Sequence, residues 1–124
     1  MDELSPFKYY YNESKGKANR PRRIKPSWCK EFDISPKYLK KIWEKQGGIC
    51  PYTGYEMVLT SSTKRLNGLN GSKDLKVASL DRINPNRGYI RGNVEFVCIP
   101  VNLAKNVYSR TRVKNFFDGI QKKG

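Results

Sequence analysis

The segment from Ser79 to Cys98, SLDRINPNRGYIRGNVEFVC, constrains the fold of this chain more than any other part of the sequence. Two short runs, LKVASLDRI and NVEFVC, are rich in the β-branched and apolar residues that favour strands. The polar connection NPNRGYIRG is longer than a two-residue hairpin turn. The segment therefore predicts a two-stranded hairpin with an irregular basic loop, and Asp81 and Arg82 lie where that loop begins.

A helix is predicted just before this region. Ser35 is a favourable N-cap, and Pro36 fits the first helical position, where its missing N–H is not needed. Gly47 and Gly48 are expected to end the helix. Three apolar side chains at helical spacing form its buried stripe: Leu39, Ile42 and Trp43.

The rest of the chain predicts further elements around the hairpin. ICPYTGYEMVLT is interpreted as a turn followed by a short strand, and SSTKRLNGLNGSKD as a mobile loop. PVNLAKNVYS has helical spacing, with Val101, Ala104 and either Val107 or Tyr108 facing inward. A final helix over residues 111–122 is expected to bury Val113, Phe116, Phe117 and Ile120. This order of elements predicts an α+β fold.

Length and composition indicate one small domain with a tail. The chain has 124 residues, of which 37% are apolar, against about 45–50% in typical globular domains. Residues 1–34 are predicted to be a basic, partly extended N-terminal arm, and residues 35–124 the folded domain. Between Lys15 and Lys30 the arm has seven basic residues, no acid and two prolines. Trp28 is the exception, because so large an apolar ring is expected to dock on the domain.

The net charge of +14, from 25 basic and 11 acidic residues, indicates a polyanionic partner. Nucleic acid is favoured over an anionic membrane, because no amphipathic helix has one long basic face. A merely solvated basic surface is the alternative. No apolar run approaches the roughly 18 residues of a membrane span, and the N-terminus lacks a signal pattern. A soluble cytoplasmic protein is therefore expected, and its odd count of three cysteines argues against a disulfide framework.

The region from Cys50 to Lys105 resembles the HNH, or ββα-metal, nuclease family. That family has Cys-x-x-Cys-Gly, then Asp-His-Ile, a loop, and Asn-Leu-x-x-Leu-Cys-x-x-Cys-Asn-x-x-Lys. This chain has CPYTG from Cys50, DRI from Asp81 and NVEFVCIPVNLAK from Asn93. It is most similar to a phage-type branch with Asp-Arg-Ile in place of Asp-His-Ile, and the resemblance covers residues 35–109. The resemblance implies a small ββα-metal core flanked by additional helices, in a bacterium or a phage-infected cell.

The resemblance also implies a catalytic set of four residues and a metal. Asp81 and Asn102 match the metal-binding positions, which would hold Mg²⁺ or Mn²⁺. Asn93 matches the residue that pins the loop and orients the catalytic group. Arg82 stands where most members have the general-base histidine. The implied partner is DNA, double-stranded above all, with RNA as the alternative.

Two departures from the family pattern change the expected chemistry. Cys50 and Cys98 match the first cysteine of each zinc knuckle, but Thr53 and Val101 replace the second, and the chain has no histidine. Structural zinc is therefore not expected, and the two thiols should pack together. Arg82 cannot act as a base at neutral pH, although it can clamp a phosphate. The base would then be Asp81 beside the metal, Tyr89 or the substrate phosphate.

Two functions remain open at this level. The first is a metal-dependent HNH-type DNA endonuclease or nickase, and the second is a non-catalytic nucleic-acid-binding protein on a degenerate HNH scaffold. In both cases Asp81–Arg82 could instead be a simple structural pair, and Asn102 a helix-capping residue. Eight basic residues are expected to contact phosphates: Arg20, Arg22, Arg23, Lys25, Arg87, Arg91, Lys105 and Arg110.

Overall fold

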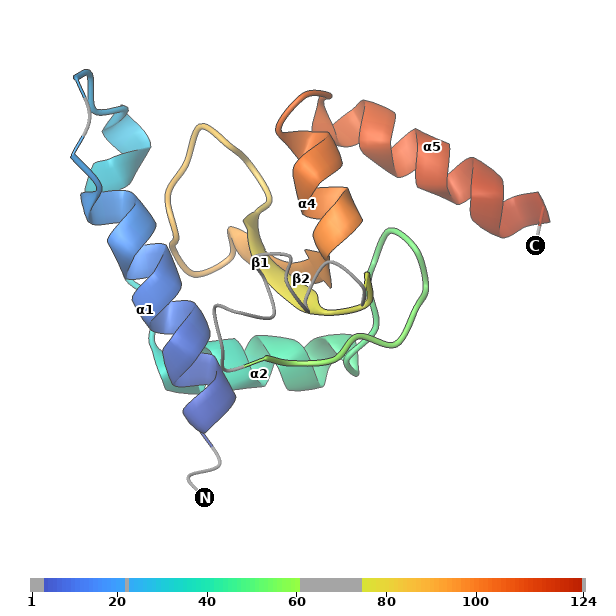
Figure 1. The fold of residues 1–124 in the computed structure, drawn as a ribbon, viewed down its shortest axis with the longest axis horizontal. Coiled ribbons are helices and arrows are strands. Elements are labelled where there is room, and N and C mark those ends of the chain that lie inside the picture. The colour runs from blue at the N-terminus through green and yellow to red at the C-terminus, as the bar shows by residue number, and fades with distance from the viewer. Residues whose placement is uncertain (1–3, 22, 61–74, 124) are drawn as a thin grey trace.

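The computed structural model describes residues 4–21, 23–60 and 75–123. These residues form four α-helices, one short 3₁₀ helix and a two-stranded antiparallel sheet, which confirms the α+β class. Figure 1 shows the hairpin in the middle of the molecule, with α1 and α2 on one side and α4 and α5 on the other. The elements in chain order are α1 (Ser5–Asn19), η1 (Ser27–Lys30), α2 (Pro36–Gln46), β1 (Ala78–Arg82), β2 (Val94–Cys98), α4 (Ile99–Lys105) and α5 (Arg110–Lys123).

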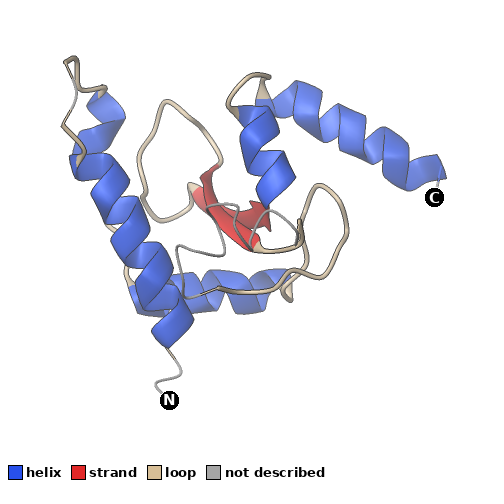
Figure 2. Ribbon diagram, in the orientation of Figure 1, coloured by secondary structure: helices blue, strands red, loops and turns tan. Residues whose placement is uncertain are grey.

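The hairpin and the helix that follows it make up the centre of the fold. In β1 and β2, Asp81 lies opposite Glu95, and Arg82 lies opposite Val94. Helix α4 begins directly after β2, at Ile99, so two strands and one helix are consecutive in space (Figure 2). This arrangement is compatible with a small ββα core.

Helix α2 forms as the sequence predicted and is tied to the hairpin. The Ser35 hydroxyl accepts a hydrogen bond from the Tyr38 backbone N–H at 3.1 Å, and Gly47 ends the helix with φ 64°. The Gln46 side chain then bonds to both backbone groups of Phe96, donating to its carbonyl at 2.9 Å and accepting from its N–H at 2.8 Å. The end of α2 is thus fixed to the middle of β2.

Helix α1 corrects the prediction that the first 34 residues form a loose arm. Its buried residues recur at helical spacing, and three of them, Phe7, Tyr10 and Ala18, belong to the core. The Tyr10 hydroxyl donates to the Ala78 carbonyl at 2.7 Å and accepts from the Thr60 N–H at 3.1 Å. Apolar burial and these two bonds outweigh the high charge of the segment. Within this segment the described residues between α1 and η1, and residues 31–34 after η1, lack helical structure.

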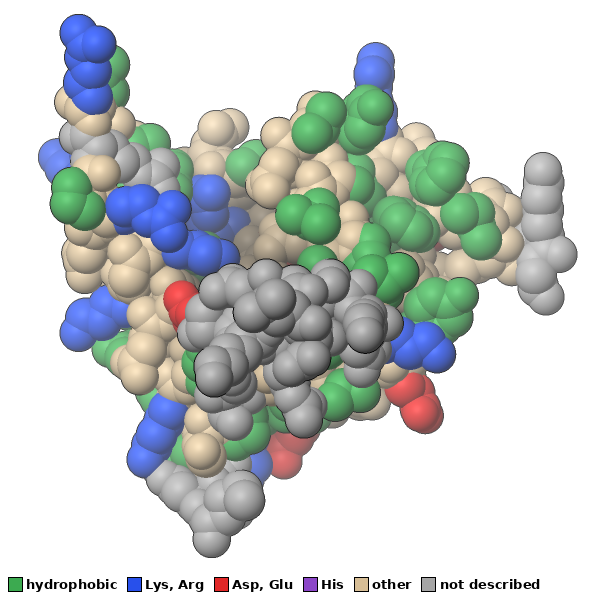
Figure 3. All heavy atoms as spheres, in the orientation of Figure 1, with side chains coloured by type: hydrophobic (Ala, Val, Ile, Leu, Met, Phe, Trp, Pro, Cys, Tyr) green, Lys and Arg blue, Asp and Glu red, His purple; other side chains and the backbone are tan. Residues whose placement is uncertain are grey.

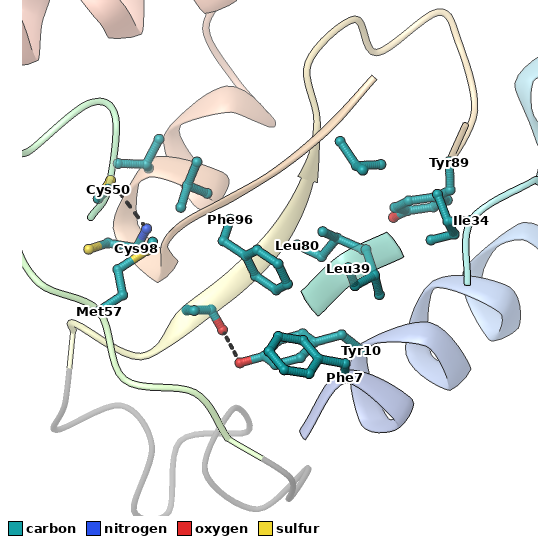
Figure 4. Packing of buried hydrophobic residues seen from close by; sticks show 14 of the residues in the cluster. Phe7, Tyr10, Ile34, Leu39, Cys50, Met57, Leu80, Tyr89, Phe96 and Cys98 are labelled. Carbon is teal, nitrogen blue, oxygen red and sulfur yellow. Dashed lines mark hydrogen bonds between the residues drawn. The ribbon is translucent and has the colours of Figure 1, made fainter. Parts of the chain in front are cut away.

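The core lies between the hairpin and the first two helices. Phe96 on β2 is fully buried and makes edge-to-face contacts with Phe7, Tyr10 and Trp43, at ring-centroid distances of 6.3, 5.2 and 5.4 Å. Figure 4 shows Phe7 and Tyr10 from α1 and Leu39 from α2 gathered beside Leu80 and Phe96 of the hairpin. Three elements distant in sequence therefore share one core.

Other predicted elements differ from the structure in three places. ICPYTGYEMVLT forms only isolated bridges, Ile49 with Glu56 and Val58 with Val77, and no strand. The last helix buries Val113, but Phe116 and Ile120 are 66% and 53% exposed, because α5 projects past the hairpin (Figure 1). On the segment before it, the two residues predicted as alternatives for the inward face are exposed: Val107 and Tyr108.

Two further expectations concern the chain as a whole. The predicted mobile loop SSTKRLNGLNGSKD lies outside the described residues. Among the helices that are described, none combines the length and the apolar character needed to cross a lipid bilayer.

Candidate functional site

A cleft with a volume of about 380 Å³ lies between α1 and α4, above the end of β1. We call it the basic cleft. Among its described lining residues there is one carboxylate, that of Asp81, and the five cations are Lys17, Arg20, Arg82, Lys105 and Arg110. Figure 3 shows Lys and Arg side chains gathered on the α1 side of the molecule, whereas hydrophobic side chains gather over α4 and α5.

The basic cleft continues into a second hollow along α1. This second hollow has a volume of about 430 Å³, and both hollows are lined by Lys17, Arg20 and Asn102. Both volumes fall in the range of small-molecule and cofactor sites. The two hollows together form a path past the metal-binding positions that the sequence predicted.

Asp81 lies in the cleft as half of a buried ion pair. Successive strand residues face opposite sides, so Asp81 shares a face of the hairpin with Ser79 and Glu95. Its carboxylate binds the Lys105 ammonium, which also donates to the Arg82 carbonyl at 3.1 Å. The two side chains of the pair are only 6% and 8% exposed. Burial raises the pKa of Asp81 above its ordinary value, and the Lys105 ammonium offsets part of the rise.

Lys105 therefore has a partner that the sequence did not suggest. It was expected to contact phosphate as part of a basic surface. The structure gives its ammonium a carboxylate inside the cleft, because α4 places Lys105 one helical turn beyond Asn102, facing β1.

Asn102 reaches the same cleft from α4. Its amide nitrogen donates to the Ser79 hydroxyl at 2.6 Å, which joins α4 to β1. Because this bond uses the nitrogen, the amide oxygen remains as a ligand atom. Asp81 and Asn102, which are separate in sequence, thus line one cavity.

Arg82 is held rigidly at the other side of the cleft. Its guanidinium lies 3.7 Å from the centre of the Trp28 ring and 5.7 Å from that of Tyr89. One terminal nitrogen, Nη1, donates to the carbonyls of Pro85 and Arg87 at 2.6 and 3.1 Å. Trp28, the ring expected to dock on the domain, thus docks against Arg82, the residue that the family resemblance aligns with a histidine.

Asn93 pins the loop between the strands. Its amide oxygen accepts from the Asn84 N–H at 2.8 Å, and its amide nitrogen donates to the carbonyls of Gly88 at 2.8 Å and Asn84 at 3.2 Å. The side chain is buried, and these bonds span the loop from its start to its end. The loop-pinning contacts expected of this residue are therefore present.

The same loop is also held from outside, by the segment after η1. The Asp33 carboxylate accepts from the Arg91 N–H at 2.7 Å, and the Asp33 N–H donates to the Tyr89 carbonyl at 3.1 Å. A Cβ on Gly88 would come within 2.1 Å of the Glu31 carbonyl oxygen, so only glycine fits there. The loop shape is thus set by residues that the sequence assigned to the arm.

The remaining predicted phosphate contacts fall into different places. Arg20 and Arg110 line the basic cleft, whereas Arg23 and Lys25 are exposed outside both hollows. Arg22 lies outside the described residues. Arg87 is exposed but bound by two nitrogens to Glu31, at 2.8 Å each, which lowers the pKa of Glu31. Arg91 lies over the Tyr38 ring, 5.7 Å from its centre.

Lys17 is the cleft residue that the sequence prediction missed. It lines both hollows, and burial lowers its pKa, with a further contribution from the nearby charges of Arg20 and Arg82. The signal that identifies it is helical spacing, because Ser14 and Ala18 on the same helix are buried. That signal has meaning only once residues 5–19 are recognised as a helix.

Cys50 and Cys98 are free, buried and in contact, as expected of packed thiols. The Cys98 N–H donates to the Cys50 sulfur at 3.5 Å, and the Thr53 hydroxyl lies 3.8 Å from the Cys98 sulfur. The hydrogen bond between the two thiol side chains lowers the pKa of Cys50 and raises that of Cys98. This cluster fixes the turn after α2 to the start of α4.

The Asp81 carboxylate and the Asn102 amide, two side-chain groups with oxygen donor atoms, line the basic cleft. Within residues 4–21, 23–60 and 75–123, no group of three or more histidine, cysteine or acidic side chains could hold a metal ion. Mg²⁺, however, is commonly held by one or two protein oxygens together with water and substrate phosphates. Asp81 and Asn102 offer such oxygens, and the Lys105 ammonium already sits on the Asp81 carboxylate as a cation.

Comparison with protein-family models, with curated proteins and with solved structures finds no match to this chain. The class that can be stated is therefore an α+β protein with a small ββα arrangement. Its function has to be inferred from the cleft.

Proposed function

We propose that this protein is a metal-dependent endonuclease or nickase of the HNH type, which hydrolyses phosphodiester bonds in DNA. The observation that supports this best is the position of Asp81 and Asn102. They come from β1 and α4, line one cleft, and share it with five cations. A carboxylate and an amide oxygen surrounded by positive charge suit both a divalent cation and a phosphodiester.

The positive charge of the cleft supports a nucleic-acid substrate. Lys17 belongs to α1 and Arg20 directly follows it. With Arg82 from β1, Lys105 from α4 and Arg110 from α5, cations of four elements line one cavity. Each phosphate that they neutralise releases condensed counterions, which makes the binding strong and salt-dependent. The net charge of +14 steers a polyanion to the protein over a longer range.

Asp81 and Asn102 would hold the cation, Mg²⁺ or Mn²⁺. When bound, such an ion stabilises the negative charge that develops on the phosphate and on the leaving oxygen. Lys105 neutralises Asp81 at other times, so that the buried carboxylate never lacks a positive partner. Asn93 contributes by holding the loop that carries Arg82's backbone acceptors.

Hydrolysis also requires that a water molecule lose a proton as it attacks phosphorus. One P–O bond forms, one P–O bond breaks, and the leaving oxygen takes up a proton. The chain has no histidine, and Arg82 stays protonated, so Arg82 can only bind the charged phosphate. Asp81 is the carboxylate that lines the cleft and is the acceptor we assign to the water proton, with the substrate phosphate as the other acceptor.

Plasmid cleavage tests this proposal. Supercoiled plasmid incubated with the protein and Mg²⁺ or Mn²⁺ should become nicked or linear, and EDTA should prevent this. Asn102→Ala and Asp81→Asn should abolish cleavage, while Arg23→Ala, outside both hollows, should cleave normally. Circular dichroism should show that each variant is folded. A wild-type protein that is inert over a range of metals and substrates would refute the catalytic proposal.

A second function, non-catalytic nucleic-acid binding on a degenerate HNH scaffold, is favoured by one observation. The buried Lys105–Asp81 pair gives Asp81 a structural role that needs no metal. This alternative predicts steeply salt-dependent DNA binding that EDTA does not change. Fluorescence anisotropy with a labelled duplex, with and without Mg²⁺, separates it from the enzyme when read together with the plasmid assay.

A further inference from the structure

We propose that Trp28 is a positioning residue that holds the guanidinium of Arg82 as a preformed binding fork for one backbone phosphate in the basic cleft. The inference rests on the proposed function in so far as the ligand is a nucleic-acid phosphate. It adds a residue of η1 to a site whose charged residues come mainly from α1, β1, α4 and α5.

The first observation is the stack between the two side chains. The Arg82 guanidinium lies 3.7 Å from the centre of the Trp28 ring, which is well inside the range of a cation–π contact. Trp28 is itself only 8% exposed and is braced edge-to-face by Tyr89, with ring centroids 6.0 Å apart. The ring is therefore a fixed platform, and it orients the plane of the guanidinium.

The second observation is how the hydrogen atoms of Arg82 are used. A guanidinium has five N–H donors, two of them on Nη1. Nη1 donates to two carbonyls, those of Pro85 and Arg87. Among the described residues these are the hydrogen bonds that its side chain makes. The Nε and Nη2 edge, which matches two oxygens of a phosphate, is left for a ligand.

Arg87, in the loop that follows Arg82, shows what an engaged fork looks like. Its Nε and Nη2 atoms both donate to the Glu31 carboxylate, at 2.8 Å each. Arg87 also lies outside the lining of the basic cleft, whereas Arg82 and Trp28 both line it. The two arginines thus have opposite arrangements. Arg87 uses its Nε and Nη2 edge within the protein, whereas Arg82 is anchored by Nη1.

The consequence for binding is preorganisation. A free arginine side chain loses rotamer freedom when it binds a phosphate, whereas Arg82 has already lost it on folding. Removing the Trp28 ring would leave the charge in place but free the guanidinium to move. The effect of removing the Trp28 ring on DNA binding should therefore resemble the effect of removing Arg82 more than that of removing a core residue.

The experiment measures how DNA affinity depends on salt, in EDTA, so that catalysis plays no part. Fluorescence anisotropy with a labelled duplex gives the slope of log K against log salt. Arg82→Ala should reduce the magnitude of this slope by about one, as expected for one lost phosphate contact. Trp28→Leu should reduce it by a similar amount, and Trp28→Phe should largely restore it. Arg112→Ala, at an exposed arginine that lines neither hollow, should leave it unchanged. The double variant Trp28→Leu/Arg82→Ala should be no worse than Arg82→Ala.

Arg82→Lys keeps the test decisive if Trp28→Leu does not fold. Lysine retains the charge but has neither the planar fork nor the stack, so its affinity should fall well below that of the wild type. Wild-type affinity in Arg82→Lys, or an unchanged slope in a folded Trp28→Leu, would overturn the inference while leaving the proposed nuclease intact. A wild-type protein with no salt-dependent DNA binding would instead refute the proposed function and this inference with it.

Discussion

The two faces of the β1–β2 hairpin differ sharply in chemistry. One face carries Leu80, Val94 and Phe96, which share a hydrophobic core with residues of α1 and α2, and ends at Arg82. The other carries the buried Val97 together with Ser79, Asp81 and Glu95, and these three side chains meet polar groups of α4 and of the turn after α2. The alternation of a β-strand places both sets on the same short hairpin.

This difference indicates which side chains of the hairpin mainly stabilise the fold. A buried ion pair such as Asp81–Lys105 stabilises a protein little compared with well-packed apolar residues of the same size, because both charges must be desolvated. The polar face is better explained by what it binds, and four substitutions put that division to the test.

The largest loss of stability is expected from a substitution on the apolar face. Phe96→Ala should lower the free energy of unfolding by about 4 kcal/mol, because it removes a fully buried ring and leaves a cavity beside Phe7, Tyr10 and Trp43. Urea unfolding followed by circular dichroism measures the loss. Leu103→Ala, at a side chain that is 61% exposed, is the control and should change stability by less than about 0.5 kcal/mol. Similar losses in both variants would contradict the assignment of the core.

The next effect should come from the polar face. Lys105→Met should lower the free energy of unfolding by about 3 kcal/mol, because it leaves the Asp81 carboxylate buried without its partner. The double variant Asp81→Asn/Lys105→Met should recover much of that loss, since neither charge remains. A double-mutant cycle in urea gives the coupling between the two residues. If the two losses were simply additive, the pair would not be coupled, and the comparison of the faces would lose its basis.

The sequence predicted the hairpin and α2 because those features depend on local patterns. Strand residues and the cap at Ser35 can both be found within a few neighbouring positions. Helix α1 was missed because its stripe consists of Phe7, Tyr10 and small residues among many charges, and only the distant Phe96 completes its burial.

The cleft partners were missed for a related reason. That Lys105 meets Asp81, and that Trp28 meets Arg82, depends on how α4 and η1 pack against β1. A charge or a ring in a sequence indicates that a partner is needed, but not which residue supplies it. The exposed stripe of α5 shows the opposite case, since Phe116 has the spacing of a core residue without a surface to cover it.

A smaller effect should arise where α1 is bonded to the hairpin. Tyr10→Phe keeps the buried ring but removes the hydroxyl, which leaves the Ala78 carbonyl and the Thr60 N–H without this partner. The free energy of unfolding should fall by about 2 kcal/mol. Tyr55→Phe, at a ring that is 55% exposed, is the matched control and should be close to neutral. Equal stability of the wild type and Tyr10→Phe would show that α1 is held by apolar packing alone.

The smallest effect is a pH dependence of the free energy of unfolding that arises from Glu95 on the polar face. Burial raises the pKa of Glu95 above its ordinary value of 4.5, and the nearby charge of Asp81 raises it further, although the Tyr52 hydroxyl donates to it at 3.1 Å. The folded state therefore holds the Glu95 proton more tightly than the unfolded state. The stability that this contributes is complete below the ordinary pKa and is lost as the pH rises through the raised value.

Glu95→Gln stays neutral throughout and should not lose stability in this way. The free energy of unfolding of Glu95→Gln, relative to the wild type, should therefore rise between about pH 4 and pH 7, as followed by urea unfolding at several pH values. Asp81 is present in both proteins, so the difference reports Glu95 together with its coupling to Asp81. A difference that stays constant with pH would mean that Glu95 is already ionised and well solvated in the folded protein. The polar face would then be an ordinary wet surface, and the contrast between the two sides of the hairpin would reduce to the Asp81–Lys105 pair.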